Sequence, residues 1–550
     1  MCRTAAERTL AAELDVVRPE LTAAYAAELP GARAAVLTRL WRGLVHEPLP
    51  WVAARTSDRE GVTLCLADGR RLRGPHSDPW ATTASVSGLD LAGVRYDHPA
   101  DLVAALAVPQ GGRLAAELDH SVASLALSRT APRRAAPPVH PWEWEQGETD
   151  GHPYHPGCRS RPGFSAAEQL AYAPEHRPVV SLRLAPVEGA AVSLSGEWPR
   201  ELRDGSSVLI PVHPWQARHV LTGPTLRPGP DAHPLLSLRT LDLGGDRHVK
   251  TSLTTQLTST VRDISAYTVT HSLATSEFVE GLARRLDGRL RIARTVAAAG
   301  AGTADLAALL RESPQVHADP AAGERVVPVA ALPALLAARP AGERLDRVVE
   351  FARLALGVCL ELLDLGVALE AHGQNLLAVV DADDRTRHLV YRDLADIRIS
   401  PARLARHGVP APPVSGRLLN DDPAVLRRKV LGSLVTGALG PLAGDAPTLG
   451  TVLETATRGL AATPDLQALR TEPLPAKALT LMRLATAGGG GGDLWTALPN
   501  PSEDGRAVTV VPATAFGPPS RCCLSRHATP RRASPRRAVR PRWRCRRRRR

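Results

Sequence analysis

The sequence has 550 residues, of which 44% are hydrophobic, and a formal net charge of +12. That length exceeds one ordinary domain, and the hydrophobic content is sufficient for packed cores, which excludes a largely disordered protein. The charge is uneven, because residues 521–550 hold 14 arginines and no Asp or Glu, leaving a net charge of −2 (12 − 14) for the rest. A nucleic-acid-binding domain is expected to spread its positive charge over a folded face, so nucleic acid is not a predicted partner of the body of the chain.

The seven cysteines form no Cys-x-x-Cys pair, so the sequence predicts neither a zinc site nor a disulfide framework. No uninterrupted apolar run reaches about 18 residues, which predicts no membrane-spanning helix and no membrane partner. The N-terminal segment is acidic and amphipathic and lacks the apolar core of a signal peptide. We therefore expect a cytoplasmic protein.

The first part of the chain predicts helices. Apolar residues recur at three- and four-residue steps over residues 10–44, where Pro19 and Pro30 are expected to divide the pattern into short helices. Residues 62–73 alternate in polarity around an Asp-Gly pair, which predicts a β-hairpin. Residues 100–130 return to helical spacing.

The middle of the chain predicts an antiparallel sheet. Residues 131–165 are rich in Pro, His, Trp and Gly and form no single regular element, whereas short β-like runs dominate residues 178–273. From residue 303 we expect helices, ending in a long buried helix over residues 345–365. Helices and loops are expected again over residues 401–480.

Six of the 18 histidines precede proline. A residue before proline is held extended and outside a helix, so these side chains sit on fixed backbone. Two interpretations stay open, namely that each histidine packs or caps a turn, or that a cluster of them forms a site with Arg159 and Arg161. A zinc site is disfavoured, because Pro153 prevents two of the histidines from sharing a helix face. The six are His98, His140, His152, His155, His213 and His233.

A polar strand is predicted over residues 250–262, KTSLTTQLTSTVR. Because side chains alternate along a strand, every second residue from Lys250 to Arg262 would share one face with a cation at each end. Such a face can bind a carboxylate or a triphosphate, although Thr-rich faces are also common on exposed sheets.

A third group surrounds a predicted hairpin formed by residues 376–380 and 388–391. The sequence EAHGQN (370–375) precedes its first strand and Arg-Asp (392–393) follows its second. The open ends of an antiparallel hairpin meet, so Asn375 and Asp393 are predicted neighbours. Their oxygens could hold Mg²⁺, as the same residue pair does in protein kinases, or they could simply be polar loop ends.

Five motifs resemble those of the IucA/IucC-type siderophore synthetases and occur in the same order. They are GHPYHPGCRSRPGFS (151–165), IPVHPWQ (210–216), the Lys-x-Ser strand, EAHGQN and Arg-Asp. The resemblance covers residues 5–502. It implies an α+β fold with a helical N-terminal thumb (1–135), a β-rich fingers domain (136–325) and a C-terminal, kinase-like palm of the FhuF-like type (326–502). Residues 503–550 are expected to form a disordered, Arg-rich tail.

The resemblance also implies the site. It assigns catalysis to Lys250, Arg262 and His372, with His372 either orienting the acid or deprotonating the amine. It places Mg²⁺ at Asn375 and Asp393. The residues it implies for binding ATP or substrate are His152, His155, Arg159, Ser237, Arg239, Thr258, Ser259, Glu370, Gln374 and Asn375.

The implied reaction is the ATP-dependent condensation of citrate, or a related di- or tricarboxylate, with an amine or alcohol. It passes through an acyl-adenylate, needs ATP and Mg²⁺, and releases AMP and pyrophosphate; the resemblance suggests a homodimer. Two other functions are considered. A kinase-like phosphotransferase would release ADP, but the chain has no Gly-rich phosphate loop. Nucleic-acid binding through the tail would leave the polar motifs of the body unexplained.

Overall fold

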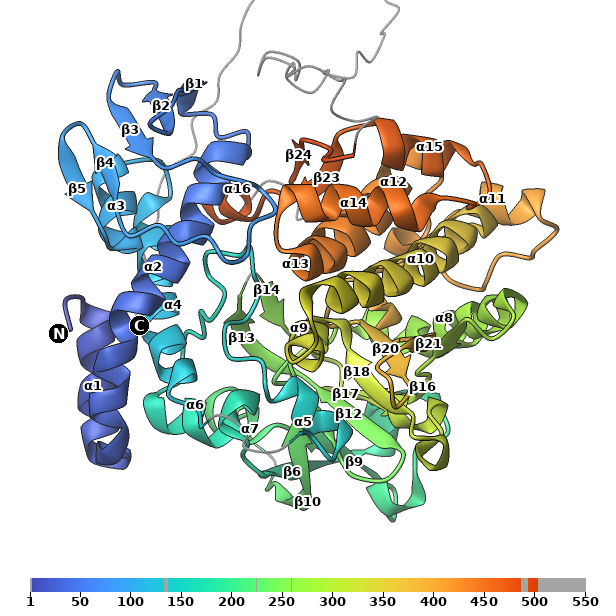
Figure 1. Cartoon of the computed structure of the whole chain (residues 1–550). Coiled ribbons are helices and arrows are strands. Elements are labelled where there is room, and N and C mark those ends of the chain that lie inside the picture. The colour runs from blue at the N-terminus through green and yellow to red at the C-terminus, as the bar shows by residue number, and fades with distance from the viewer. Residues whose placement is uncertain (1, 133–136, 224, 259, 486–492, 503–550) are drawn as a thin grey trace, which may run out of the picture. The chain divides into compact units, whose positions relative to one another are not determined.

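The computed structural model describes residues 2–132, 137–223, 225–258, 260–485 and 493–502. The glycine-rich segment at 488–492, the Arg-rich tail at 503–550 and Ser259 therefore lie outside the described residues. The described part mixes helices and sheets, which confirms the predicted α+β class (Figure 1). None of its helices has the length and apolarity of a membrane span.

The N-terminal part contains four helices and a five-stranded sheet of order β1-β2-β3-β4-β5, which contribute to one hydrophobic core. The hairpin predicted at 62–73 is confirmed as β2 and β3, which pair antiparallel. The helices are α1 (Ala5–Val17), α2 (Thr22–His46), α3 (Pro99–Leu106) and α4 (Gly111–Arg129). The strands are β1 (Val52–Ser57), β2 (Val62–Leu66), β3 (Arg71–Gly74), β4 (Leu89–Leu91) and β5 (Val94–Tyr96).

The predicted break at Pro30 is wrong, because α2 continues through it. A proline inside a helix removes one backbone hydrogen bond, at a cost of about 3 kcal/mol. Leu29, Ala32 and Val36 are fully buried around it in the N-terminal core, and this burial offsets the loss. The break at Pro19 does occur, in a short 3₁₀ turn between α1 and α2.

A nine-stranded sheet forms the middle of the chain, and its antiparallel pairing over residues 178–273 is confirmed. Its order is β7-β16-β17-β12-β11-β10-β6-β9-β8. The strands are β6 (Val180–Glu188), β7 (Ser193–Gly196), β8 (Arg203–Asp204), β9 (Ser207–Val212), β10 (Arg227–Pro234), β11 (Thr240–Asp242), β12 (Arg247–Thr251), β16 (Thr295–Gly300) and β17 (Ala307–Glu312).

The helices expected from residue 303 begin later, because β17 and β18 (Arg325–Pro328) are strands. All but the last residue of β17 are buried, since this strand lies between β16 and β12. A short apolar run that is buried on both faces carries no alternation, so its pattern does not distinguish a central strand from a helix.

The single strand predicted over residues 250–262 is also wrong. Strand β12 ends at Thr251, and the chain then forms a separate hairpin of β13 (Leu253–Leu257) and β14 (Thr260–Arg262). The chain reverses at Thr258, which takes a φ of 59°. Arg262 therefore pairs with Leu253 instead of lying at the far end of a continuous polar face.

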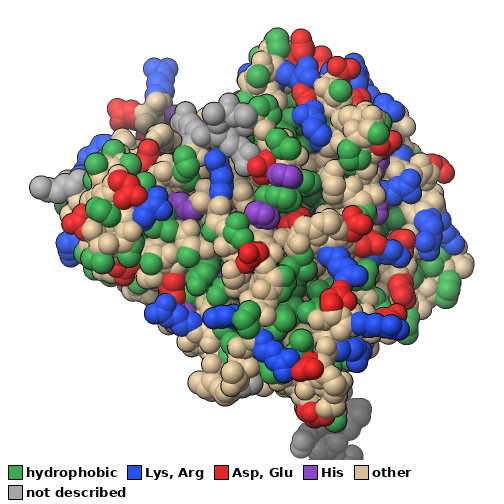
Figure 2. Space-filling model, turned by 90° about the horizontal axis from the view of Figure 1, so that it is seen from below, with side chains coloured by type: hydrophobic (Ala, Val, Ile, Leu, Met, Phe, Trp, Pro, Cys, Tyr) green, Lys and Arg blue, Asp and Glu red, His purple; other side chains and the backbone are tan. Residues whose placement is uncertain are grey.

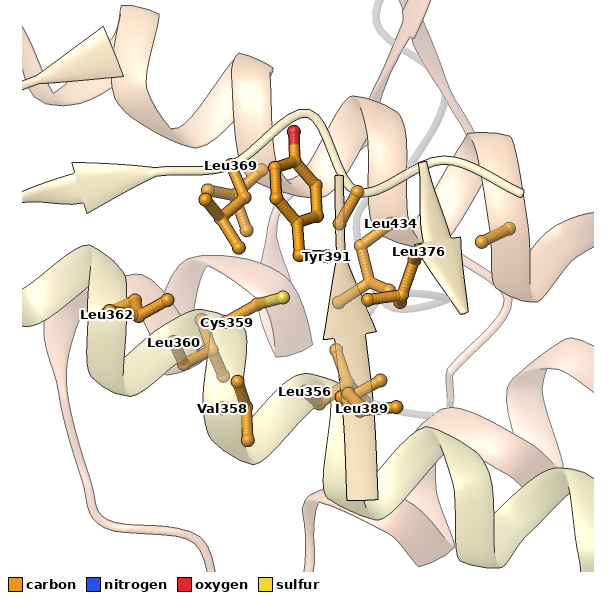
Figure 3. Packing of buried hydrophobic residues seen from close by; sticks show 14 of the residues in the cluster. Leu356, Val358, Cys359, Leu360, Leu362, Leu369, Leu376, Leu389, Tyr391 and Leu434 are labelled. Atoms are coloured by element: carbon orange, nitrogen blue, oxygen red, sulfur yellow. The ribbon is translucent and has the colours of Figure 1, made fainter. Parts of the chain in front are cut away.

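The C-terminal part packs helices on a four-stranded sheet of order β15-β21-β20-β18. The predicted hairpin is confirmed as β20 (Leu376–Val380) and β21 (Thr386–Tyr391), with Leu376 opposite Tyr391 at its open end. The long helix predicted at 345–365 is confirmed as α10 (Ala341–Leu365). Figure 3 shows Leu356 and Cys359 of α10 directed toward side chains of β20 and β21, among them Tyr391 of β21.

The helices that follow residue 400 confirm the helical character of residues 401–480. They are α11 (Pro401–Arg406), α12 (Pro423–Leu434), α13 (Gly440–Ala443), α14 (Ala446–Thr457), α15 (Pro464–Thr471) and α16 (Leu479–Leu484). Two short strands, β23 (Leu474–Lys477) and β24 (Trp495–Leu498), pair with each other.

Two segments contact parts of the fold that are distant from them in the sequence. Strand β15 (Leu290–Ile292) joins the C-terminal sheet by pairing parallel with β21, and α8 (Ala266–Ala283) also contacts β15. Helix α16 returns to α2, where the carboxylate of Glu47 accepts from the N–H groups of Thr480 and Leu481 over 3.0 and 2.7 Å.

Candidate active site

Two adjoining cavities have volumes of about 120 and 800 Å³. The middle and C-terminal parts line both cavities, and helix α2 and residues 76–86 of the N-terminal part also line the larger one. The two cavities share six lining residues, so they form one continuous hollow. The shared residues are Cys158, Arg159, Leu236, Thr258, Arg262 and Gln374.

Most of the residues implied by the motifs line these cavities. Those on the smaller cavity alone are Ser237, Arg239, Lys250 and Asp393, and those on the larger alone are His152, His155, Glu370 and His372. Asn375 lines neither, because its side chain is buried and its Nδ2 donates to the carbonyl of Glu370 over 3.4 Å. Ser259 is outside the described residues.

Lys250 and Asp393 form the centre of the smaller cavity. Lys250 comes from β12 and Asp393 follows β21, and the ammonium group donates to both carboxylate oxygens over 2.9 and 2.6 Å. Arg311, on β17, lies 3.5 Å from the same carboxylate. Sequence reasoning missed Arg311, because its only signal is a charged residue within the apolar run that was read as helical.

Burial and like charges determine the protonation behaviour of this centre. Burial, with Arg239 and Arg311 nearby, lowers the pKa of Lys250 to about 7 even though Asp393 acts to raise it. Burial alone would raise the pKa of Asp393, but Lys250 and Arg311 hold it well below its usual range. One ionised carboxylate is thus surrounded by several cations, and the centre has an excess of positive charge.

Arg239 and Arg262 add two cations without a carboxylate partner among the described residues. Arg239 donates to the carbonyls of Arg262 and Asp263, and Arg262 donates to the carbonyl of Leu257 over 3.1 Å. Burial, with Arg262 adding to it, lowers the pKa of Arg239 to about 10. Because backbone carbonyls orient these groups without neutralising them, they can bind an anion bidentately.

Three residues of the cavity wall have left-handed backbone, which non-glycine residues seldom adopt. Leu238, Thr258 and Asp393 have φ values of 66°, 59° and 71°. Such conformations store strain of about 1–3 kcal/mol and persist only where the surroundings hold them, which is most common at functional sites.

The histidines before proline mainly cap turns. Nδ1 of His155 accepts from the N–H of Gly157 over 2.9 Å, and Nδ1 of His213 accepts from Trp215 over 3.1 Å. His152 accepts from Tyr154 and His155 in the same way. Burial lowers the pKa of both His155 and His213 to about 3, so both rings are neutral at pH 7.

His372 has the same arrangement, since its Nδ1 accepts from the N–H of Gln374 over 3.2 Å. Burial lowers its pKa, although Glu370 acts in the opposite direction. A neutral imidazole whose Nδ1 accepts a hydrogen bond carries its proton on Nε2. The remaining nitrogen of His372 is therefore a donor.

Glu370 belongs to an ion-pair cluster. Its carboxylate accepts from Lys477 over 2.9 Å and from Lys429 over 3.3 Å. Burial alone would raise the pKa of Glu370, but these two lysines lower it to about 2. Asp396 and Asp493 approach Glu370 closely enough to suggest a cation site, and Lys429 contacts all three carboxylates within 3.8 Å. The lysines therefore supply the positive charge of this cluster.

Two protein-family models match the chain. The IucA / IucC family matches residues 140–334, and the ferric iron reductase FhuF-like transporter family matches residues 349–491. The rhizobactin siderophore biosynthesis protein RhbC of Rhizobium meliloti (strain 1021) is 34% identical over 102 residues, a match that covers 15% of this chain and 17% of that protein. The chain thus matches about a sixth of the length of this curated relative.

Solved structures share the fold over most of the chain. The petrobactin biosynthesis protein AsbB of Bacillus anthracis str. Sterne has a TM-score of 0.72 at 18% identity, covering 90% of this chain and 99% of its own. ATP-bound aerobactin synthetase IucA of Klebsiella pneumoniae has a TM-score of 0.63 at 19% identity, covering 86% and 99%. Residues 140–334 thus match the IucA / IucC family, and most of the chain has the same fold as the solved structures of AsbB and IucA.

Proposed function

We propose that the protein activates citrate, or a related di- or tricarboxylate, as an acyl-adenylate and transfers the acyl group to an amine or alcohol. The observation that carries this proposal is the convergence of Lys250, Arg239, Arg262 and Arg311 around Asp393, at the wall of a cavity that opens into a larger one. The excess positive charge suits a polyphosphate, and the larger cavity has room for the acid and the acceptor. The ATP-bound state of aerobactin synthetase IucA supports ATP as the nucleotide.

The first step forms a bond between a carboxylate oxygen and the α-phosphorus of ATP and breaks the bond to the β-phosphate, so that pyrophosphate leaves. Negative charge develops on the phosphate oxygens, where Arg239, Arg262 and Lys250 stabilise it. In the second step the amine or alcohol forms a bond to the acyl carbon, the bond between that carbon and the AMP oxygen breaks, and AMP leaves, while the proton of the nucleophile passes to solvent. We assign to His372 the orientation of the acid through its Nε2–H, because its Nδ1 is already engaged by Gln374.

Magnesium is expected with ATP, and the residues proposed for it are chemically suitable. Asp393 and the side-chain oxygen of Asn375 are the oxygen donors that Mg²⁺ prefers. The carboxylate of Asp393 lines the smaller cavity, and both its oxygens accept from the ammonium group of Lys250, which Mg²⁺ would have to displace from at least one of them. When bound there, Mg²⁺ would neutralise phosphate charge.

The test measures pyrophosphate release by the full chain with Mg-ATP, a panel of di- and tricarboxylic acids, and hydroxylamine as the trap. Acid-dependent pyrophosphate with a trapped hydroxamate is expected, and Arg262→Ala should reduce the rate at least about a hundredfold. Arg247→Ala is the matched control, because Arg247 lies on the same strand as Lys250 but pairs with Glu201 at the surface. ADP instead of pyrophosphate would replace the proposal with a phosphotransferase.

The face of the molecule shown in Figure 2 gives no support for nucleic-acid binding. In the face shown in Figure 2, Lys and Arg side chains are interspersed with Asp and Glu and no large field of one sign is visible. Electrostatic binding of nucleic acid depends on such a field. A homodimer and a cytoplasmic location remain proposals, and the first can be tested by sedimentation of the purified protein.

A further inference from the structure

Glu145 and Arg392 form a buried ion pair between two segments of the site. Glu145 ends the short helix α5 (Pro141–Glu145), and Arg392 directly follows β21. The two side chains are 4% and 5% exposed, and the guanidinium donates one hydrogen bond to each carboxylate oxygen over 2.8 Å. Neither residue lines either cavity, so neither contacts a molecule bound there.

Each partner also holds the backbone of a loop that lines the cavities. Oε2 of Glu145 accepts from the N–H of Leu236 over 3.0 Å, next to Ser237. Arg392 donates from Nε and Nη2 to the carbonyl of Gln374 over 3.1 and 2.9 Å. One ion pair therefore fixes residues 235–239 and the open end of the β20–β21 hairpin to a common point.

The same two loops contain two of the strained residues. Leu238 lies two residues after Leu236, and Asp393 directly follows Arg392, both with positive φ. Strained backbone of this kind relaxes when the contacts around it are removed. The Glu145–Arg392 ion pair therefore hydrogen-bonds to the backbone of both loops that contain strained residues.

We propose that Glu145 and Arg392 are positioning residues for nucleotide binding. They set the distance between the loop that carries Ser237 and Arg239 and the hairpin end that carries Gln374 and Asp393, so that both sides face the same nucleotide. Small displacements of binding groups strongly reduce affinity and rate, so this arrangement needs a rigid support. This inference rests on the proposed function, because that function identifies the nucleotide as ATP.

The test compares Glu145→Ala with Glu7→Ala in the full chain. Glu7 is a matched control, because Arg33 holds it in a similarly buried fork, over 2.7 and 2.6 Å, and neither residue lines a cavity. Two quantities are measured: hydrogen exchange of the amides of residues 235–239, and the dissociation constant for ATP by calorimetry. The exchange readout needs no nucleotide and does not depend on catalysis.

Glu145→Ala should accelerate exchange at Leu236 and its neighbours and raise the dissociation constant for ATP about tenfold, whereas Glu7→Ala should leave both unchanged. Unchanged exchange or affinity in Glu145→Ala, or equal changes in both variants, would overturn the proposal. If Glu145→Ala does not fold, Glu145→Gln retains the shape and one acceptor, and it should give smaller changes of the same kind; no change would overturn the proposal. If the proposed ligase activity is wrong, acid-dependent pyrophosphate release will be absent, but the faster hydrogen exchange in Glu145→Ala will still be observed.

Discussion

Lys250 and Asp393 join the nine-stranded sheet to the end of the β20–β21 hairpin, because the ammonium group donates to both carboxylate oxygens. Within the described part of the chain, Asp393 is the carboxylate that also contacts Arg311. Before any ligand binds, the single negative charge of Asp393 therefore faces several cations at the smaller cavity and does not neutralise them all. The first two predictions follow from this imbalance.

Asp393→Asn should destabilise the ligand-free protein by about 3 kcal/mol, since it leaves Lys250 and Arg311 buried without a carboxylate. Tripolyphosphate should restore more of the lost stability than it adds to the wild type, because it supplies the missing negative charge. Thermal unfolding with and without tripolyphosphate measures both effects.

The control is Asp384→Asn. Asp384 lies at the opposite end of the same hairpin and holds two arginines, Arg325 and Arg339, each at 2.6 Å, outside both cavities. Equal responses of the two variants to tripolyphosphate would contradict a special role for Asp393.

ATP binding above pH 7 should be accompanied by proton uptake at Lys250. Its pKa is lowered to about 7, so the ammonium group is mostly neutral at pH 8, and a bound polyphosphate raises the pKa again. Uptake should approach one proton per ATP at pH 8 and vanish below about pH 6, and affinity should fall by up to about tenfold per pH unit above pH 7. Calorimetry in buffers of different ionisation enthalpy measures the uptake. Lys250→Arg keeps its charge and should show none; equal uptake in both proteins would refute this assignment.

His213 should contribute to loss of stability in acid. Burial lowers its folded-state pKa to about 3, below the unfolded value of about 6.5, so the unfolded state binds more protons between these values. Stability is therefore fully present above about pH 6.5 and falls as the pH decreases toward 3. His213→Asn retains an acceptor for the N–H of Trp215, and its stability should decline less steeply, by up to about 1.4 kcal/mol per pH unit. Urea unfolding at a series of pH values tests this, and parallel curves would count against it.

Thr258→Gly should raise the free energy of unfolding by about 1 kcal/mol, because a β-branched residue is strained at a φ of 59° and glycine is not. The same change should weaken ATP binding, since Thr258 lines both cavities. Urea unfolding and calorimetry measure the two quantities. Thr260→Gly, in the adjoining strand, should instead destabilise the protein. Equal decreases in the free energy of unfolding of the two variants would exclude stored strain at Thr258.

Local signals were sufficient for much of the fold. The Asp-Gly turn predicted β2 and β3, and the polar turn before Thr386 predicted β20 and β21, because the chemistry of short turns is contained in neighbouring residues. Helix α10 followed from its length and its apolar pattern. The motif residues could be named, but the sequence did not show which of them share a wall of which cavity.

The errors arose where distant partners decide the structure. Residues 250–262 alternate like one strand, yet the chain leaves the sheet at Ser252, whose hydroxyl donates to the carbonyl of Ala304. The sequence did not indicate the roles of Arg311 and Glu145, because each acquires its role from a partner more than 80 positions away. Pairings of this kind depend on tertiary packing, which local pattern does not contain.

The contact of Glu47 with α16 also has a consequence for synthesis of the chain. Its carboxylate accepts from Thr480 and Leu481, which follow it by 433 and 434 positions, and Leu481 and Leu484 pack on the N-terminal core. A nascent chain on the ribosome can form α1 to α4 early, but Glu47 then has no backbone donors. The N-terminal part therefore reaches its final structure only after the last helix has emerged, and vectorial folding from the N-terminus cannot complete it.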